Sequence, residues 1–138
     1  MRSAMRVLSS VVMPVTSSED IVVVRTAVRK QSVSLGFNLV DQTKLVTASS
    51  ELARNTLDYG GGGTARIEVI DDGRRAGIRV TFEDQGPGIP DAALALSDGY
   101  TSGHGMGLGL GGAKRLCHDF ELRSAPGEGT VVSIARWK

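Results

Sequence analysis

Hydrophobic and polar positions alternate in patterns that divide the chain into strands and helices. Residues 6–15 are rich in β-branched side chains and end near Pro14, which predicts a first strand. An Asp-Asp-Gly-Arg-Arg turn separates two later apolar runs, as expected for two antiparallel strands joined by a tight connection. The same reasoning predicts four further strands, at residues 64–70, 77–83, 120–124 and 130–137.

Two amphipathic helices are predicted between the first strand and the second. The first begins at a capping-box signal formed by Ser17 and Asp20, and it ends at Gly36. The second is capped by Asn38 and runs to about Asp58. Each helix carries an apolar stripe that is expected to face the core: Ile21, Val24, Val28 and Leu35 in the first, and Leu45, Ala48 and Leu52 in the second.

The segment between the third and fourth predicted strands has an unusual pattern. A short helix is predicted at 90–96, residues 97–105 fit neither element, and a second helix is predicted at 106–118. The last of these contains four glycines, and such a conflict between propensity and pattern is typical of a functional segment. The irregular order of strands and helices predicts a single α+β domain over residues 1–138. We expect a two-layer sandwich, in which helices cover one face of a mostly antiparallel mixed sheet.

Composition changes this picture in one respect, which is glycine. The chain has 18 glycines among 138 residues, nearly twice the average frequency of about 7%. They cluster between hydrophobic runs, which indicates tight bends or backbone that closely approaches a ligand. The net charge of +1 argues against nucleic-acid binding through a strongly basic face. The single cysteine, Cys117, excludes an intramolecular disulfide and is expected to pack as an apolar residue.

Targeting signals are also missing from the pattern. No segment combines a clean apolar stretch with a small-residue cleavage site, and no apolar run approaches the ~20 residues of a membrane span. We therefore expect a cytoplasmic protein with neither a membrane nor a nucleic acid as its partner.

Glu51 and Asn55 form the first constellation that could carry chemistry. They are four residues apart on a predicted helix, so their side chains share a face that differs from the apolar stripe. A carboxylate beside an amide oxygen can polarise a hydroxyl group and hold a hard cation. A solvated helix face would give the same pattern, and the pair alone does not distinguish the two.

Asp84, Gly86 and Gly88 form the second constellation, directly after an apolar strand. The strand fixes the carboxylate, and the glycines let the backbone turn with no side chain in the way. A carboxylate placed in this way can accept a hydrogen bond from the amine of a purine. The alternative is a turn capped by the aspartate itself.

The third constellation is the glycine-rich run from Gly103 to Leu110. Backbone N–H groups at a helix N-terminus bind phosphates, and glycine allows their close approach. Residues 107–112 also match the dinucleotide fingerprint, which we reject because no strand precedes them and no βαβ unit surrounds them. A flexible loop remains the alternative. The later Gly-Glu-Gly-Thr segment that ends at Thr130 is, by itself, typical of a hairpin turn.

Taken in order, these motifs resemble the GHKL superfamily of ATPases and kinases, whose nucleotide-binding domain is the Bergerat fold. The succession is Glu-x-x-x-Asn, Asp-x-Gly-x-Gly, Gly-x-Gly-Leu-Gly-Leu and Gly-Thr, and it extends over nearly the whole chain. Within the superfamily, segments 39–43, 50–55, 98–100 and 112–116 resemble the RsbT serine kinases more than the anti-sigma factors RsbW and SpoIIAB. Gly111, which stands where proline is expected, departs from that pattern.

The resemblance implies ATP and Mg²⁺ as cofactors and gives the motif residues their roles. Asp84 would accept from the adenine amine, with Thr130 assisting through water, and Asn55 would hold Mg²⁺. Glu51 would accept the proton of the incoming serine or threonine hydroxyl. The remaining nucleotide contacts would come from Gly86, Gly88, Gly103, Gly105, Met106, Gly107, Leu108 and Gly109.

The resemblance also implies partners. STAS-domain proteins of the RsbS and RsbR type would be the substrates of the kinase. A PP2C-type phosphatase similar to RsbU would be its downstream target. The alternative is an anti-sigma factor that sequesters a sigma factor and phosphorylates the STAS-domain antagonist of that factor. A nucleotide-dependent switch without catalysis is a third reading, against which the intact Glu51 and Asn55 argue.

Overall fold

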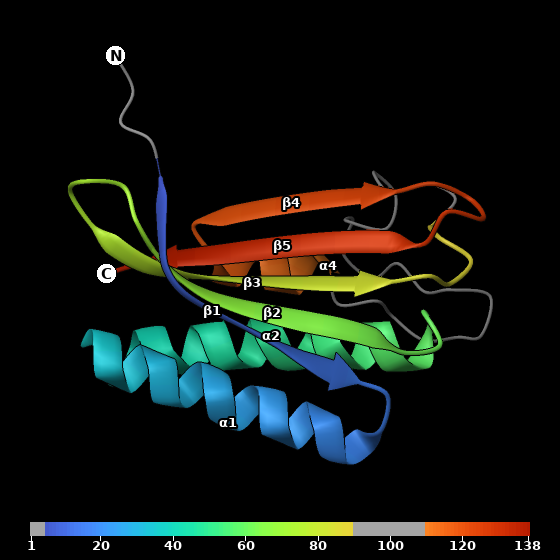
Figure 1. Ribbon diagram of the computed structural model, residues 1–138, viewed down its shortest axis with the longest axis horizontal. Coiled ribbons are helices and arrows are strands. Elements are labelled where there is room, and N and C mark those ends of the chain that lie inside the picture. The colour runs from blue at the N-terminus through green and yellow to red at the C-terminus, as the bar shows by residue number, and fades with distance from the viewer. Residues whose placement is uncertain (1–4, 90–109) are drawn as a thin grey trace.

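In the described part of the chain, an antiparallel sheet has helices packed against it. The computed structural model describes residues 5–89 and 110–138, and in these the sheet order is β1-β2-β3-β5-β4 (Figure 1). The α+β class and the two-layer arrangement predicted from the sequence are confirmed. The elements are β1 (Arg6–Val15), α1 (Ser18–Leu35), α2 (Leu39–Asp58), β2 (Gly63–Asp71), β3 (Ala76–Asp84), α4 (Leu110–Leu116), β4 (Asp119–Ser124) and β5 (Thr130–Trp137).

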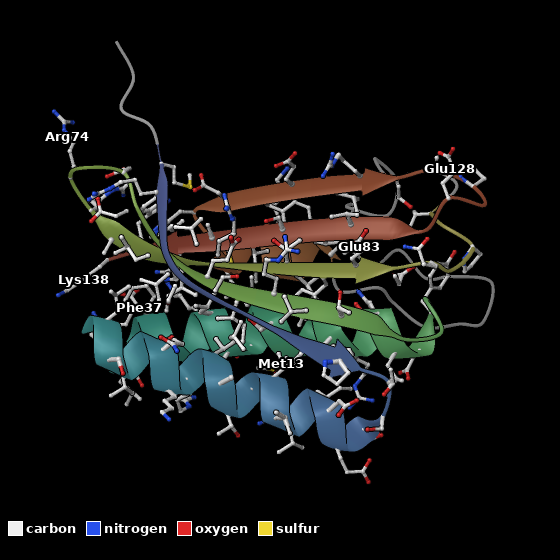
Figure 2. All side chains as sticks on the ribbon, in the orientation of Figure 1. Met13, Phe37, Arg74, Glu83, Glu128 and Lys138 are labelled. Atoms are coloured by element: carbon white, nitrogen blue, oxygen red, sulfur yellow. The ribbon has the colours of Figure 1, made fainter. Side chains whose placement is uncertain are left out.

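The main core lies between the sheet and the helices, where α1 and α2 run side by side (Figure 1). Burying such apolar surfaces is the main force that holds the two layers together. Phe37, in the connection between α1 and α2, is buried in this core (Figure 2). Both predicted helix stripes contribute to the core: Ile21, Val24, Val28, Leu45, Ala48 and Leu52 are buried, and Leu35 packs against them while partly exposed.

The predicted ends of α1 and α2 are confirmed by their caps. The Asp20 N–H donates to Ser17 Oγ over 3.2 Å, and the Asp41 N–H donates to Asn38 Oδ1 over 2.8 Å. Gly36 ends α1 with a φ of 91°, a left-handed conformation that favours glycine. The Asp20 carboxylate interacts with Ser17, as the capping box predicts, and it also accepts from the N–H and the hydroxyl of Thr16 over 2.9 and 2.8 Å.

The helix predicted at 106–118 is described from Leu110 and ends at Leu116, two residues early. The chain leaves the helix because the His118 N–H donates to the carbonyl oxygen of Ala135 and β4 pairing begins at the next residue. The short helix predicted at 90–96 and the segments 97–105 and 106–109 lie outside the described residues. Among the helices of the described part, none is long and apolar enough to cross a membrane.

Arg136 of β5 contacts both α2 and α4. Its guanidinium donates to Asp41 Oδ1 of α2 over 2.6 Å and to the Leu116 carbonyl oxygen of α4 over 2.7 Å. Arg136 is buried, and its charge is balanced by a carboxylate that is only a quarter exposed. The contact fixes the C-terminal end of α4 against the N-terminal turn of α2.

Replacing Arg136 by methionine is expected to lower the free energy of unfolding by about 2 kcal/mol, because Asp41 and the Leu116 carbonyl lose a charged donor. Urea denaturation measures the change. The matched control is Arg54→Met, which removes the exposed Arg54–Asp58 pair on the surface of α2 and should cost under about 1 kcal/mol. Equal losses for both variants would contradict the role given to Arg136.

Cys117 lies half-buried against the main core, as predicted. Burial raises the pKa of its thiol to about 11, so the thiol is protonated at neutral pH. The neighbouring His118 accepts a hydrogen bond from the Trp137 N–H through Nδ1. The two adjacent side chains therefore do not form a reactive pair.

Candidate functional site

A small pocket lies where β3, β5, α2 and α4 meet. Its enclosed volume is about 20 Å³, room for about one water molecule, so a larger ligand enters only if side chains at the rim move. The exposed wall surface is mostly apolar, which suits the faces of a flat ring, and five side chains with polar groups supply specificity. The lining residues are Leu52, Asn55, Thr56, Tyr59, Phe82, Asp84, Ile89, Leu110, Thr130 and Val132.

Asp84 is the acidic residue of this lining, and the end of β3 holds it in place. The ladder pairs Asp84 with Gly63 on one side and with Thr130 on the other. Its Oδ1 accepts from the Gly86 N–H over 2.9 Å. Only 7% of the residue is exposed, and this burial raises the pKa of the carboxyl group, an effect that the N–H groups of Gly86 and Thr130 partly offset.

Changing Asp84 to asparagine is expected to increase the free energy of unfolding of the ligand-free protein at neutral pH. Because the pKa of Asp84 is higher in the folded state than in the unfolded state, the folded state binds more protons between these two pKa values. The stability of the wild type therefore falls as the pH rises from the unfolded-state value through the folded-state value. The variant should lose this part of the pH dependence. Thermal melts from acid to neutral pH measure it, with the exposed Glu121→Gln as the matched control. A less stable variant at neutral pH would contradict the expectation.

Glycines surround Asp84 because backbone lies against it. A Cβ on Gly60 would overlap the Asp84 carboxyl group, and one on Gly129 would overlap the Asp84 carbonyl oxygen. A Cβ on Gly86 would come within 2.7 Å of the Gly60 backbone, and Gly88, at a φ of 77°, lies against the carbonyl of Ala125. Close packing of the chain on itself therefore requires glycine at both positions of the Asp-x-Gly-x-Gly motif.

The segment that follows Asp84 is held from two sides. The Tyr59 hydroxyl at the end of α2 donates to the Gly88 carbonyl over 3.0 Å. On the other side, the Ile89 N–H donates to Ser124 Oγ over 2.7 Å, and the Gly127 N–H donates to the Pro87 carbonyl over 2.7 Å. These contacts preorganise the pocket wall before any ligand arrives.

Thr130 lies in the pocket lining at the start of β5, as its predicted site role requires. It is buried, and its hydroxyl is 2.8 Å from Ser124 Oγ. Ser124 also donates to the Gly129 carbonyl over 2.9 Å. This network fixes the Thr130 side chain beside Asp84.

Glu51 and Asn55 lie one turn apart on α2, as predicted. Asn55 contributes to the pocket lining, whereas Glu51 is exposed beyond it. The apolar residues of the same helix, Leu52 and Ala53, point into the core. The arrangement places an amide at the pocket and a carboxylate at the solvent, where a second reactant can approach.

The predicted phosphate-binding residues Gly103, Gly105, Met106, Gly107, Leu108 and Gly109 lie outside the described residues. Downstream of them, Lys114 and Arg115 on α4 are exposed.

Three residues of the site were missed from the sequence. Tyr59 and Ser124 act through contacts with residues far along the chain, and no local pattern marks them. Gly60 belongs to a glycine run that indicated only the end of a helix. Its contact with Asp84 depends on the β2–β3 register, which sequence spacing alone does not reveal.

Comparison with known proteins decides the family. Residues 40–138 match the family of histidine kinase-, DNA gyrase B- and HSP90-like ATPases. The chain belongs to this GHKL superfamily. Within the GHKL proteins it is 45% identical, over 118 residues, to the serine/threonine-protein kinase RsbT of Bacillus subtilis (strain 168). That alignment covers 86% of this chain and 89% of RsbT, so the GHKL domain is an RsbT-type serine/threonine-protein kinase that uses ATP.

Solved structures share the GHKL fold at low sequence identity. The structure of the RsbU and RsbW domains of Rv1364c from Mycobacterium tuberculosis matches with a TM-score of 0.63 at 17% identity, covering 93% of this chain and 31% of that one. A chain of the SiaB–SiaC complex from Pseudomonas aeruginosa matches with a TM-score of 0.56 at 16% identity, covering 96% of this chain and 91% of that one. Both show the fold alone.

Proposed function

We propose that this kinase transfers the γ-phosphoryl group of ATP to a serine or threonine of a STAS-domain protein in a bacterial partner-switching pathway. The observation that carries the proposal is the arrangement on α2, where Asn55 lines the pocket and Glu51 stands one turn away in solvent. A protein acceptor is large, so the group that receives its proton must be accessible from outside. The 45% sequence identity to RsbT supports the same activity.

Adenine would occupy the pocket beside Asp84 after side chains at its rim move, because the enclosed volume of about 20 Å³ holds only about one water molecule. The chemistry of the lining suits it, because apolar walls accept the ring and a carboxylate accepts the exocyclic amine. Thr130 would support the same edge of the base through a water molecule. Gly86 and Gly88 would place their backbone along the ring.

The triphosphate would extend from the pocket toward Asn55. The amide oxygen of Asn55 would hold Mg²⁺, which prefers few protein ligands together with phosphates and waters. The N–H groups of the glycine-rich run, residues 103–109, would bind the phosphates. When bound, the metal neutralises charge on the transferred group.

Glu51 would act as the general base. Its carboxylate accepts the proton of the acceptor hydroxyl as the hydroxyl oxygen bonds to the γ-phosphorus and the bond to the β-phosphate oxygen breaks. The products are ADP and a phosphoserine or phosphothreonine. Phosphoryl transfer depends mainly on positioning and charge stabilisation, so few side chains suffice.

The proposal includes a second partner. After release from the STAS-domain proteins, which would resemble RsbS and RsbR, the kinase would bind and activate a PP2C-type phosphatase similar to RsbU. The exchange would take place in the cytoplasm. It rests on the likeness to RsbT.

The test follows labelled γ-phosphate from ATP onto a purified cognate STAS-domain protein, with Mg²⁺ and with a chelator. Label on serine or threonine that requires Mg²⁺ is the expected result. Nucleotide binding without transfer would overturn the proposal and favour sequestration, with a sigma factor as the next partner to examine.

A further inference from the structure

An open groove lies along α1 and α2, apart from the pocket at Asp84. Its volume is about 430 Å³. Five lining residues come from α1 and one from α2, and the Arg29 side chain crosses between the helices to donate to Gln42 Oε1 over 3.2 Å. The lining consists of Val22, Arg25, Thr26, Arg29, Lys30 and Val46.

The charge of this groove has one sign. Arg25, Arg29 and Lys30 line it, and none of its described lining residues is acidic. The chain as a whole is nearly neutral, with a net charge of +1, so this concentration of cations is a local feature. A ligand with carboxylates along one side would complement it.

The groove also offers apolar surface. Val22 and Val46 contribute methyl groups to the lining, and Val22 is 56% exposed. Along α1, Val22, Thr26, Arg29 and Val33 follow one another at spacings of three or four residues, and Val33 is also exposed. This stripe is about 16 Å long at a rise of about 1.5 Å per residue, which matches about three turns of a helix.

We propose that the groove docks an acidic amphipathic helix of a protein partner. The inference rests on the proposed function, because a switching kinase has to hold partners at a surface that leaves its nucleotide pocket accessible. A helix with glutamates or aspartates flanking a leucine-type stripe supplies the apolar contacts and the charge together. A groove that combines two valines with three cations favours such a helix over a nucleic acid, whose backbone would meet only the cations.

Docking here would reach the catalytic region through α2. The helix is continuous from Leu39 to Asp58, and Val46 of the groove precedes Glu51 by little more than one turn. The partner on the groove and the reactant at Glu51 would therefore contact one rigid element.

Amide chemical-shift mapping of the isotope-labelled full chain tests the inference. The probe is a synthetic helical peptide of leucine and glutamate, and the same peptide with lysine in place of glutamate is its charge control. Vesicles of phosphatidylcholine with phosphatidylglycerol, and an oligodeoxythymidine, test the other occupants. Shifts from the acidic peptide should cluster at Val22, Thr26, Arg29 and Val46.

A matched pair of double variants makes the test specific. Arg25→Glu combined with Lys30→Glu should lower the affinity for the acidic peptide about tenfold. Arg66→Glu with Arg74→Glu changes the net charge equally at exposed positions outside the groove lining, and it should leave affinity unchanged. Arg74 points away from the body of the molecule at the β2–β3 turn (Figure 2). A thermal melt of each variant verifies folding.

The inference would be overturned if the lysine peptide caused equal shifts, or if vesicles or DNA alone shifted the groove amides. It would also be overturned if the acidic peptide caused no shifts or shifts outside the groove, or if both double variants weakened its binding equally. The mapping needs neither nucleotide nor acceptor protein. A failure of phosphoryl transfer is therefore distinguishable from a failure of the groove.

Discussion

Replacing Glu51 by alanine is expected to lower phosphoryl transfer by about 10²–10⁴-fold, the usual contribution of a general base. ATP binding should remain close to that of the wild type, because Glu51 is exposed and does not line the pocket that holds Asp84. The folded state should also be preserved, since the side chain buries little surface. Single-turnover transfer and nucleotide titration separate the two effects.

The matched control for Glu51 is Asp58→Asn, on the same helix. Asp58 forms a surface ion pair with Arg54, one turn away, at 3.7 Å. Such an exposed pair contributes little to stability. Its variant should transfer phosphate at the wild-type rate. If nucleotide affinity fell as far as transfer in Glu51→Ala, the assignment of Glu51 as the base would be wrong.

Replacing Gly60 by alanine is expected to lower ATP affinity about a hundredfold and to destabilise the fold by about 3 kcal/mol. The new methyl group would overlap the Asp84 carboxyl group, which is short and is held by a hydrogen bond from the Gly86 N–H. Asp84 would have to leave the position from which it faces the pocket. Nucleotide titration and urea denaturation measure the two losses.

Gly112→Ala is the control for Gly60. A Cβ at Gly112, on α4, meets no atom of residues 5–89 or 110–138 within 4 Å, so the substitution should be neutral or stabilise the helix by up to about 1 kcal/mol. A Gly60→Ala variant that bound ATP normally would show that Asp84 can move without loss, and the proposed adenine contact would then fail.

Local signals were sufficient to predict most of the fold. The caps at Ser17 and Asn38 and the left-handed Gly36 are decided by residues within a few positions of one another. The apolar stripes of α1 and α2 repeat at the helical period, so their buried faces could be identified before the partner surface was known. For every strand, both predicted ends lie within one residue of the observed ends.

Long-range contacts were beyond the same reasoning. Arg136 and Asp41 are 95 residues apart in sequence, and no spacing indicates that they meet. The capping box of Ser17 and Asp20 was predicted, but the two further hydrogen bonds that Thr16 donates to Asp20 were not. The candidate site divides in the same way. The motif residues Asn55, Asp84 and Thr130 could be named from their order, whereas Tyr59 and Ser124 required the folded geometry.

The position of β5 has a consequence for how the protein is made. Among the described strands β5 is the last in sequence, yet it lies inside the sheet, between β3 and β4. The ribosome therefore releases β1, α1, α2, β2 and β3 before the residue opposite Asp84 exists. Until Thr130–Trp137 is translated, one edge of β3 has unpaired backbone N–H and C=O groups. Strand pairing between segments so distant in sequence also forms slowly. An unpaired strand edge is prone to pair with other chains, so we expect chaperone binding to protect β3 during synthesis.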